Sequence, residues 1–400
     1  LVTHTDQIGS VTRFIYNRQH DLLQITDPLG HQVVRNEYDA SGRLIATTDA
    51  NGNRVTFTHN LAAQEEVITN TRGAIRRILY NAQGNVTSDE QIVTINGTAV
   101  NAVTTSAYDA QGNETSRVDP DGLLITSTYS GVMPLSQVVD PGGVNLGTSY
   151  TYNARNDVTA IVDPAGRTFS FSYNSNGNIT QVNTPMTGTT AAIANAQGQP
   201  SLIQDSLGNT RILTYDSFGN VTREEVFDGA ITLLRRTDFT YDANGNKLTE
   251  TLYRTIDGTL TPLTTQFTYD AANRVIIITD PAGGITGIEY DAAGHETART
   301  NPLGQRTTFV YDARGNKIRT NYPDGTFVTA VYDSEGNLVS QNDRAGRTTT
   351  FEYDELNRQV KTVLPNGASV RTIYSVGGRI AATIDAKGNR TDYTYDTAGR

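Results

Sequence analysis

The sequence predicts an all-β protein, a continuous antiparallel meander of β-hairpins that coils into a spiral, hollow shell. Three observations predict this fold. A six-residue motif beginning Tyr-Asp returns along the whole chain, a second turn motif lies between its copies, and the runs between the two motifs are short and rich in β-branched and aromatic residues. A fixed period of this kind indicates an array of one small unit rather than a globular domain around a pocket.

The Tyr-Asp motif, typified by residues 311–316, sets the phase of the array. It occurs 18 times, 16 copies begin with Tyr, and 12 of the 17 intervals are 21 residues long. His59 and Ala194 replace the Tyr but lie 21 residues from both neighbouring copies. We therefore expect residues 1–400 to form a single array of about 18 repeats with no separate domain boundary. Because both ends of the sequence are in phase, we expect this array to be an open segment of a longer one.

The second motif lies between successive copies of the first and is typified by Asp163-Pro164-Ala165-Gly166. Its Gly usually precedes the next Tyr by seven residues, as Gly304 precedes Tyr311. Asp or Asn bonds the nearby backbone, Pro presets φ, and Gly adopts a positive φ without steric cost. Both motifs are therefore predicted to be tight turns.

The runs between the turns are predicted strands, for example residues 307–311 and 317–321. They are too short for helices, and their Thr, Val, Ile, Phe and Tyr residues fit a pleated sheet. Alternation places Phe309 and Tyr311 on one face of the sheet and Thr308 and Val310 on the other. We expect the rings to form a row across equivalent strands, with each pair contributing about 0.2–1 kcal/mol. Either face is compatible with lining the interior.

The number of strands predicts the hollow. Eighteen hairpins supply 36 strands, which at about 4.8 Å each make a ribbon roughly 170 Å long. Ribbons of this length must coil, and closing this one once would give a ring about 55 Å across, too wide for side chains to fill. The hydrophobic content of 36% and the absence of Trp also suit a thin wall better than a thick core.

Two intervals of 28 residues, from Tyr80 to Tyr108 and from Tyr241 to Tyr269, predict lengthened hairpins. Their tips are Asn96-Gly97 and Asp257-Gly258, both strong signals for tight hairpins. Each hairpin is expected to extend past the sheet margin by about 10 Å. The extensions are interpreted as contacts to a partner, contacts to a neighbouring turn of the spiral, or neutral additions.

Composition narrows the function classes. The net charge is −10, and the absence of a basic stripe argues against nucleic-acid binding. No apolar run approaches 18 residues, so no transmembrane helix is expected. The chain contains no Cys, which excludes disulfides and is compatible with a bacterial product of any compartment.

The motifs of catalysis and ligand binding are missing. The five His residues form neither HxxxH nor HExxH, and neither a Gly-x-Ser-x-Gly elbow nor a phosphate-binding loop is present. The repeated Asp residues, such as Asp312, are compatible with Ca²⁺ binding, but the glycine-rich nonapeptide of calcium β-rolls is absent, so we interpret them as turn formers. We therefore predict no catalytic, cofactor-binding or metal-binding residue, no cofactor and no enzymatic activity.

Residues 304–325, which contain Tyr311-Asp312 and Gly315-Asn316, resemble the YD repeat of the Rhs family. The resemblance covers the whole chain and extends to the shell components of insecticidal Tc toxins and to teneurins. In the bacterial members it implies a spiralling β-sheet cocoon that holds a carboxy-terminal toxin until delivery. The resemblance implies that a non-repetitive segment closes the shell and, in the bacterial members, also cuts the toxin free by self-proteolysis. No such segment is found in residues 1–400, so no catalytic residue is carried over.

We therefore expect a structural role, as the wall of a β-cocoon that encapsulates and helps deliver a C-terminal toxin or effector in a secreted bacterial polymorphic toxin. Its expected partners are that toxin domain and the remaining shell repeats, with secretion machinery and cell-surface glycans as further candidates. The alternative is a cell-surface adhesion or carbohydrate-binding module. Either function places the protein outside the bacterium, secreted or at the cell surface.

Overall fold

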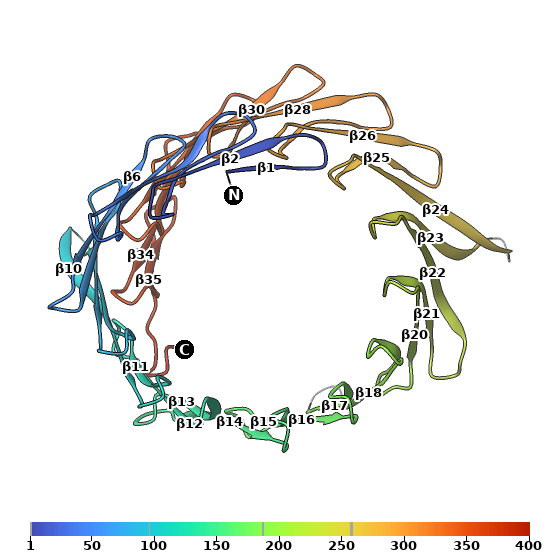
Figure 1. Ribbon diagram of the computed structural model, residues 1–400, viewed down its shortest axis with the longest axis horizontal. Coiled ribbons are helices and arrows are strands. Elements are labelled where there is room, and N and C mark those ends of the chain that lie inside the picture. Colours follow the sequence, from blue (N-terminus) through green and yellow to red (C-terminus); the bar gives the residue numbers. More distant parts are fainter. Residues whose placement is uncertain (1, 96, 186–187, 257–258) are drawn as a thin grey trace.

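A computed structural model of the chain describes residues 2–95, 97–185, 188–256 and 259–400. Within these ranges the chain forms 36 strands and no helix, and the strands belong to one sheet (Figure 1). The strands are β1 (Thr3–Thr5), β2 (Val11–Tyr16), β3 (Leu22–Thr26), β4 (Gln32–Tyr38), β5 (Leu44–Asp49), β6 (Arg54–Asn60), β7 (Glu65–Thr69), β8 (Ile75–Tyr80), β9 (Val86–Ile95), β10 (Thr98–Tyr108), β11 (Glu114–Val118), β12 (Leu124–Ser130), β13 (Met133–Val139), β14 (Leu146–Tyr152), β15 (Val158–Val162), β16 (Thr168–Tyr173), β17 (Ile179–Thr184), β18 (Gly188–Ala194), β19 (Pro200–Gln204), β20 (Thr210–Tyr215), β21 (Val221–Phe227), β22 (Leu233–Tyr241), β23 (Lys247–Ile256), β24 (Thr259–Tyr269), β25 (Val275–Thr279), β26 (Ile285–Tyr290), β27 (Glu296–Thr300), β28 (Arg306–Tyr311), β29 (Lys317–Asn321), β30 (Phe327–Tyr332), β31 (Leu338–Asn342), β32 (Thr348–Tyr353), β33 (Gln359–Val363), β34 (Ser369–Tyr374), β35 (Ile380–Ile384) and β36 (Arg390–Asp392).

Each strand pairs antiparallel with the next strand in the sequence, which confirms the predicted meander. In β28 and β29, for example, Thr308 pairs with Asn321 and Phe309 with Thr320. The sheet is therefore a strip with two margins. The turns that follow odd-numbered strands, such as Asp163–Gly166, form what we call the DxxG margin. The turns that follow even-numbered strands, such as Asp312–Gly315, form the YD margin.

The Asp at the head of a turn holds that turn together. One oxygen of Asp312 accepts hydrogen bonds from the backbone N–H groups of Arg314 and Asn316, each at 2.9 Å. The other oxygen accepts from the Asn316 side chain at 3.0 Å. Gly315 closes the turn with a φ of 84°, a backbone conformation that favours glycine. On the other margin, Asp163 binds the two backbone N–H groups and the side chain of Arg167 in the same way.

The Tyr of the repeat joins neighbouring strands through its hydroxyl group. The pairing register shifts between Val310 and Tyr311, a bulge that recurs at most of the repeat tyrosines. The Tyr311 hydroxyl donates to the carbonyl oxygen of Glu296, the first residue of β27, at 2.8 Å. Equivalent bonds are made by Tyr38, Tyr108, Tyr129, Tyr152, Tyr173, Tyr215, Tyr241, Tyr269, Tyr290, Tyr353, Tyr374 and Tyr395.

The side chain after the Gly or Asn with positive φ in the YD turn often stacks on the Tyr of the next repeat. The guanidinium of Arg274 lies 4.6 Å from the centre of the Tyr290 ring, and the His295 and Tyr311 rings stack at 4.8 Å. The aromatic row predicted from the sequence thus runs along the YD margin, but cations, an imidazole and hydroxyl bonds connect the rings. Each such cation–π contact contributes about 0.5–1 kcal/mol at an exposed site.

The wall is a single layer, as its composition predicted. Most side chains of the described residues are half-buried or exposed, and only a few apolar ones are buried. The buried apolar residues are Ala46, Ile78, Val93, Ala102, Leu213, Ile288, Ala298 and Ala382. Cohesion therefore depends mainly on hydrogen bonds between strands and on the turns.

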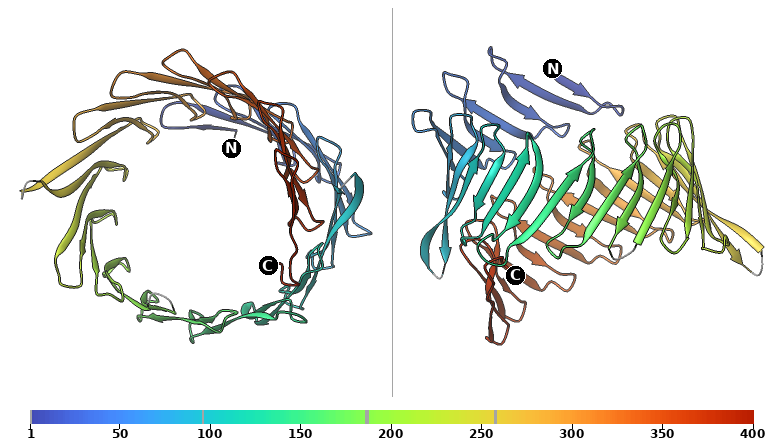
Figure 2. Two further views of the ribbon diagram at one scale, coloured as in Figure 1. Left: turned by 180° about the vertical axis from the view of Figure 1, so that it is seen from behind. Right: turned by 90° about the horizontal axis from the view of Figure 1, so that it is seen from below.

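The strip coils into a spiral of more than one turn and encircles a centre that no described strand crosses (Figure 1). The strands from β28 onward lie beside β5–β14 and are displaced from them along the axis (Figure 2). The tight turn between β28 and β29 contacts the tight turn between β5 and β6. One turn of the spiral therefore contains 23 strands. At about 4.8 Å per strand the ring is about 35 Å across, narrower than a ring of all 36 strands, because the sheet coils more tightly than a single closure requires.

The irregular stretches also form hairpins. Residues 184–200, the least strand-like part of the sequence, contribute to β17, β18 and β19, and Gln181 of β17 pairs with Ala191 of β18. The two predicted long hairpins are β9–β10 and β23–β24, each with strands of 10 and 11 residues. Of their predicted tips, Asn96, Asp257 and Gly258 lie outside the described residues.

Replacing Tyr311 by Phe is expected to destabilise the protein by about 0.5–1.5 kcal/mol, because it removes the hydroxyl bond to the Glu296 carbonyl and keeps the ring. Urea unfolding followed by circular dichroism measures the change. Tyr332→Phe is the matched control, since the Tyr332 hydroxyl has no hydrogen-bond partner within the ranges that the structure describes. Equal losses of stability in the two variants would contradict the assignment.

Candidate functional site

The most distinctive surface of the molecule is the seam between successive turns of the spiral. The DxxG margin of β5–β14 lies against the YD margin of β28–β36, so residues about 260 positions apart meet. The Arg314 guanidinium lies 3.2 Å from the carboxylate of Asp49. One hairpin further along, the Thr71 hydroxyl donates to the Ser334 hydroxyl at 2.9 Å.

Asp121 and Arg379 carry a second group of seam contacts. One oxygen of Asp121 accepts from the backbone N–H of Gly377 and the other from the Ser375 hydroxyl, both at 2.8 Å. Arg379 donates to Asp119 at 3.1 Å. Near the end of the strip, the Thr397 hydroxyl donates to Asp140 at 2.5 Å. The turns therefore meet through carboxylates, hydroxyls and guanidinium groups.

The long hairpin β9–β10 crosses this seam. The backbone N–H and the hydroxyl of Thr94 donate to the two carboxylate oxygens of Glu355, at 3.1 and 2.7 Å. Burial acts to raise the pKa of Glu355, but the Thr94 hydrogen bonds and the charge of Arg72 outweigh it and hold the pKa below its usual value. Val93 on the same hairpin is 0% exposed. Of the three interpretations of the long hairpins, contact with a neighbouring turn is confirmed for β9–β10.

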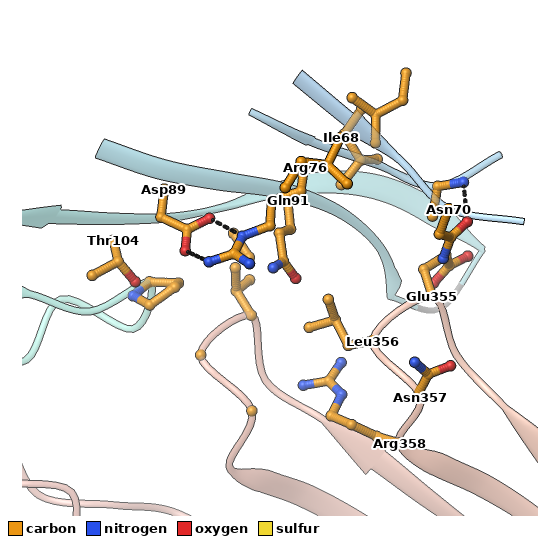
Figure 3. Close-up of a pocket in the computed structure, with 18 of the residues that line it drawn as sticks. Ile68, Asn70, Arg76, Asp89, Gln91, Thr104, Glu355, Leu356, Asn357 and Arg358 are labelled. Atoms are coloured by element: carbon orange, nitrogen blue, oxygen red, sulfur yellow. Dashed lines mark hydrogen bonds and ion pairs between the residues drawn. The ribbon is translucent and has the colours of Figure 1, made fainter. Parts of the chain in front are cut away.

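A cavity of about 690 Å³ lies in the seam beneath this hairpin (Figure 3). Arg76, Asp89 and Gln91 line it from one turn, and Leu356 and Arg358 face them from the other (Figure 3). Arg76 already pairs with Asp89 at 2.8 Å, and Arg358 pairs with Asp354 at 2.7 Å. The charged groups of the cavity thus hold one another and leave an open, mixed polar and apolar gap between packed turns.

The residue types that were considered for chemistry serve the turns and the sheet. His31 and His295 lie 3.0 Å from Asp27 and Asp291, the residues that head their turns. His59, which replaces a Tyr, bonds the carbonyl oxygen of Leu44 at 2.7 Å and so keeps the bridge between strands. Within the described ranges no group of three His, Asp or Glu side chains is arranged to hold a metal ion, and no helix is long and apolar enough to span a membrane. The absence of catalytic and cofactor residues stays a prediction.

Asp238 is the carboxylate with the most strongly shifted titration. Its hydrogen bond with Arg236, at 2.5 Å, and its contact with Arg223, at 2.9 Å, lower its pKa from 3.8 to about 2, although burial opposes the shift. Its side chain is 23% exposed and lies on β22 rather than in a cleft. A structural ion cluster explains the shifted pKa without catalysis.

The seam contacts themselves were not predicted. Asp119–Gly122 has the sequence of an ordinary turn, and nothing in it marks Asp121 as a partner of residues more than 250 positions away. The one signal in the sequence was the extra length of the hairpin that carries Thr94. That signal identified the element but not its partner, Glu355.

A single-layer antiparallel strip that coils on itself defines a class of protein, the spiral β-shell. The family comparisons agree with this class. The RHS Repeat model matches residues 241–285, 290–326 and 332–369, and the Teneurin YD-shell model matches residues 50–195. The resemblance found in the sequence is confirmed over these residues, which match the Rhs repeat and teneurin YD-shell families.

Among solved structures, a chain of a Photorhabdus luminescens Tc holotoxin pore superposes with a TM-score of 0.79 over 97% of this chain, at 16% identity. This likeness shows that the two share the shell fold. The chain spans about a quarter (24%) of the length of that Tc toxin chain. Two crystal structures of TcdB2–TccC3 complexes match 100% and 99% of this chain and 35% and 33% of their own, at 12% and 14% identity, with TM-scores of only 0.30 and 0.29. No curated protein matches.

Replacing Asp238 by Asn is expected to reduce stability at neutral pH by on the order of 1 kcal/mol, the range of partly exposed ion pairs. Because folding lowers this pKa, the contribution is fully present above the unfolded value of 3.8 and is lost as the pH falls through about 2. Urea unfolding at pH 6 and at pH 2 tests this, with wild type and variant expected to converge at pH 2. Asp392→Asn, which alters an exposed pair with Arg390, is the control. A difference of the same size at both pH values would contradict the prediction.

Proposed function

We propose that this chain is a wall segment of a hollow β-shell that encloses a carboxy-terminal toxin or effector domain and helps deliver it. The observation that carries the proposal is the coiling of one continuous sheet around a centre that no described strand crosses. A container needs a continuous wall. Consecutive strand pairing supplies it along the strip, and the seam contacts join successive turns of the spiral. The wall is passive and non-enzymatic.

The Tc toxin likeness supports the proposal at the level of the fold. Since the chain spans only 24% of that longer chain, the natural partners in this proposal are further repeats that complete the shell and the domain held inside it. Such a protein acts after secretion or at the bacterial surface. Secretion machinery is a further proposed partner.

Protease protection tests the proposal on the natural full-length protein that contains this array. The enclosed domain is expected to resist added protease for at least ten times longer than the same domain alone. Arg379→Ala removes the ion pairs to Asp119 and Asp121 across the seam and is expected to shorten the protection, whereas Arg390→Ala removes an exposed ion pair away from the seam and is expected to leave it unchanged. Digestion of the enclosed domain as fast as the free domain would refute encapsulation.

The alternative, adhesion or carbohydrate binding, rests on the hairpin β23–β24, which extends outward from the ring (Figure 1). By contrast, β9–β10 is occupied by its contact with Glu355. Under this alternative, the chain binds glycans or cell surfaces, and shortening β23–β24 abolishes the binding. A glycan array probed with the native chain and with the shortened variant measures this binding. Absence of binding by the native chain would exclude the alternative.

A further inference from the structure

The repeat creates a register problem at the seam. Tight turns on the DxxG margin repeatedly begin with Asp, as at Asp49, Asp119 and Asp140. Tight turns on the YD margin are repeatedly followed by Arg, as at Arg358 and Arg379. If the second turn of the spiral slipped by one hairpin along the first, Asp119 would face Arg358 instead of Arg379. A similar set of polar contacts would then form. Each slip changes the circumference by two strands, about 10 Å, and the width of the shell by about 3 Å. Contacts between the repeated tight turns therefore only weakly fix the number of strands in one turn of the spiral. Strand pairs whose side-chain pattern is weak have the same ambiguity of register.

The hairpin β9–β10 breaks this degeneracy. Its strands are 10 and 11 residues long, whereas β7 and β11 have five residues each. Thr94 offers two donors at once, and Glu355 accepts both with its two carboxylate oxygens. The same position of the preceding and following YD turns holds Ser334 and Val376, neither of which has a carboxylate. A slip in either direction would therefore place Ser334 or Val376, and not Glu355, at the position opposite Thr94.

The hairpin also overlaps the second turn instead of ending at its margin. Thr94 and Ile95 line a space of about 320 Å³ together with Val360 and Ile373 of β33 and β34. Val93 is fully buried, although the wall elsewhere is a single layer with few buried side chains. A slipped register would move these apolar side chains to a different part of the second turn.

We propose that β9–β10 is a register clasp, a specific contact surface that selects 23 strands per turn and so sets the width of the shell. The remaining seam contacts hold successive turns of the spiral together. The clasp determines which tight turns meet across the seam. This inference goes beyond the wall function, since it concerns how the strip closes whether or not a domain lies inside.

The chain contains its own matched control. Residues 255–259 of β23–β24 repeat the tip of β9–β10 with a single change, Asp257 for Asn96, and the two hairpins have strands of equal length. Thr94 pairs with Ala99 and Thr255 pairs with Leu260, so both threonines have the same position in their hairpins. Both threonines are exposed, but Thr94 is bonded to Glu355 across the seam, whereas β23–β24 extends outward from the ring (Figure 1). Shortening β23–β24 therefore alters an equivalent hairpin outside the seam.

The experiment measures the distance across the seam by double electron–electron resonance. Because the chain has no Cys, the pair Arg54→Cys and Lys317→Cys places one spin label on each side, near the contact of Asp49 with Arg314. In one variant β9–β10 is shortened by seven residues to the regular repeat length, with the turn of residues 301–304 at its tip. In the control variant β23–β24 is shortened identically. A third variant, Glu355→Ala, removes only the acceptor of the clasp.

The native chain and the control are expected to give one narrow distance. The variant with the shortened β9–β10 is expected to give additional distances, because each slip displaces one label along the seam by about 10 Å, the width of one hairpin. Glu355→Ala is expected to show the same added distances at lower population. A single unchanged distance in both the shortened β9–β10 and the Glu355→Ala proteins would overturn the proposal, as would equal broadening in the β23–β24 control. Circular dichroism confirms in each case that the sheet is retained.

Discussion

Hydrogen bonding of each strand to its two neighbours in sequence is the constraint on which the rest of the structure depends. It makes the sheet a strip that is widened only at the longer hairpins, with one kind of turn on each margin. A strip of single thickness buries little, so its stability has to come from the ladder, the Asp-headed turns and the tyrosine hydroxyls rather than from a core. Because neighbouring strands twist relative to one another, a strip this long must also coil.

Local features of this strip could be predicted from the sequence for a physical reason. A residue such as Asp312 acts on atoms two and four residues away, and Gly315 acts on its own φ, so their roles are contained in a short window of sequence. The 21-residue period then carries one correct hairpin along the whole chain. The extra length of β9–β10 was visible for the same reason, because it is a local departure from the period.

The long-range features could not be predicted. The number of strands per turn is the sum of small rotations between many strand pairs, and no single residue records it. The partnership of Thr94 with Glu355 depends on that sum, because the two residues are 261 positions apart. The row of rings was only partly predicted for a similar reason. Alternation places Tyr311 on a face, but the contact of its ring with His295 depends on where the neighbouring turn places the imidazole.

The facing of opposite margins across the seam has a geometric consequence. Turns of one margin follow odd-numbered strands and turns of the other follow even-numbered strands, so the offset between them, 23, has to be an odd number. The contacts across the seam join turns and not strands, so the strip meets itself margin to margin and advances along its axis. In a barrel, added strands widen the lumen. In this coil, added repeats lengthen the lumen at constant bore, so the volume enclosed grows in simple proportion to the number of repeats.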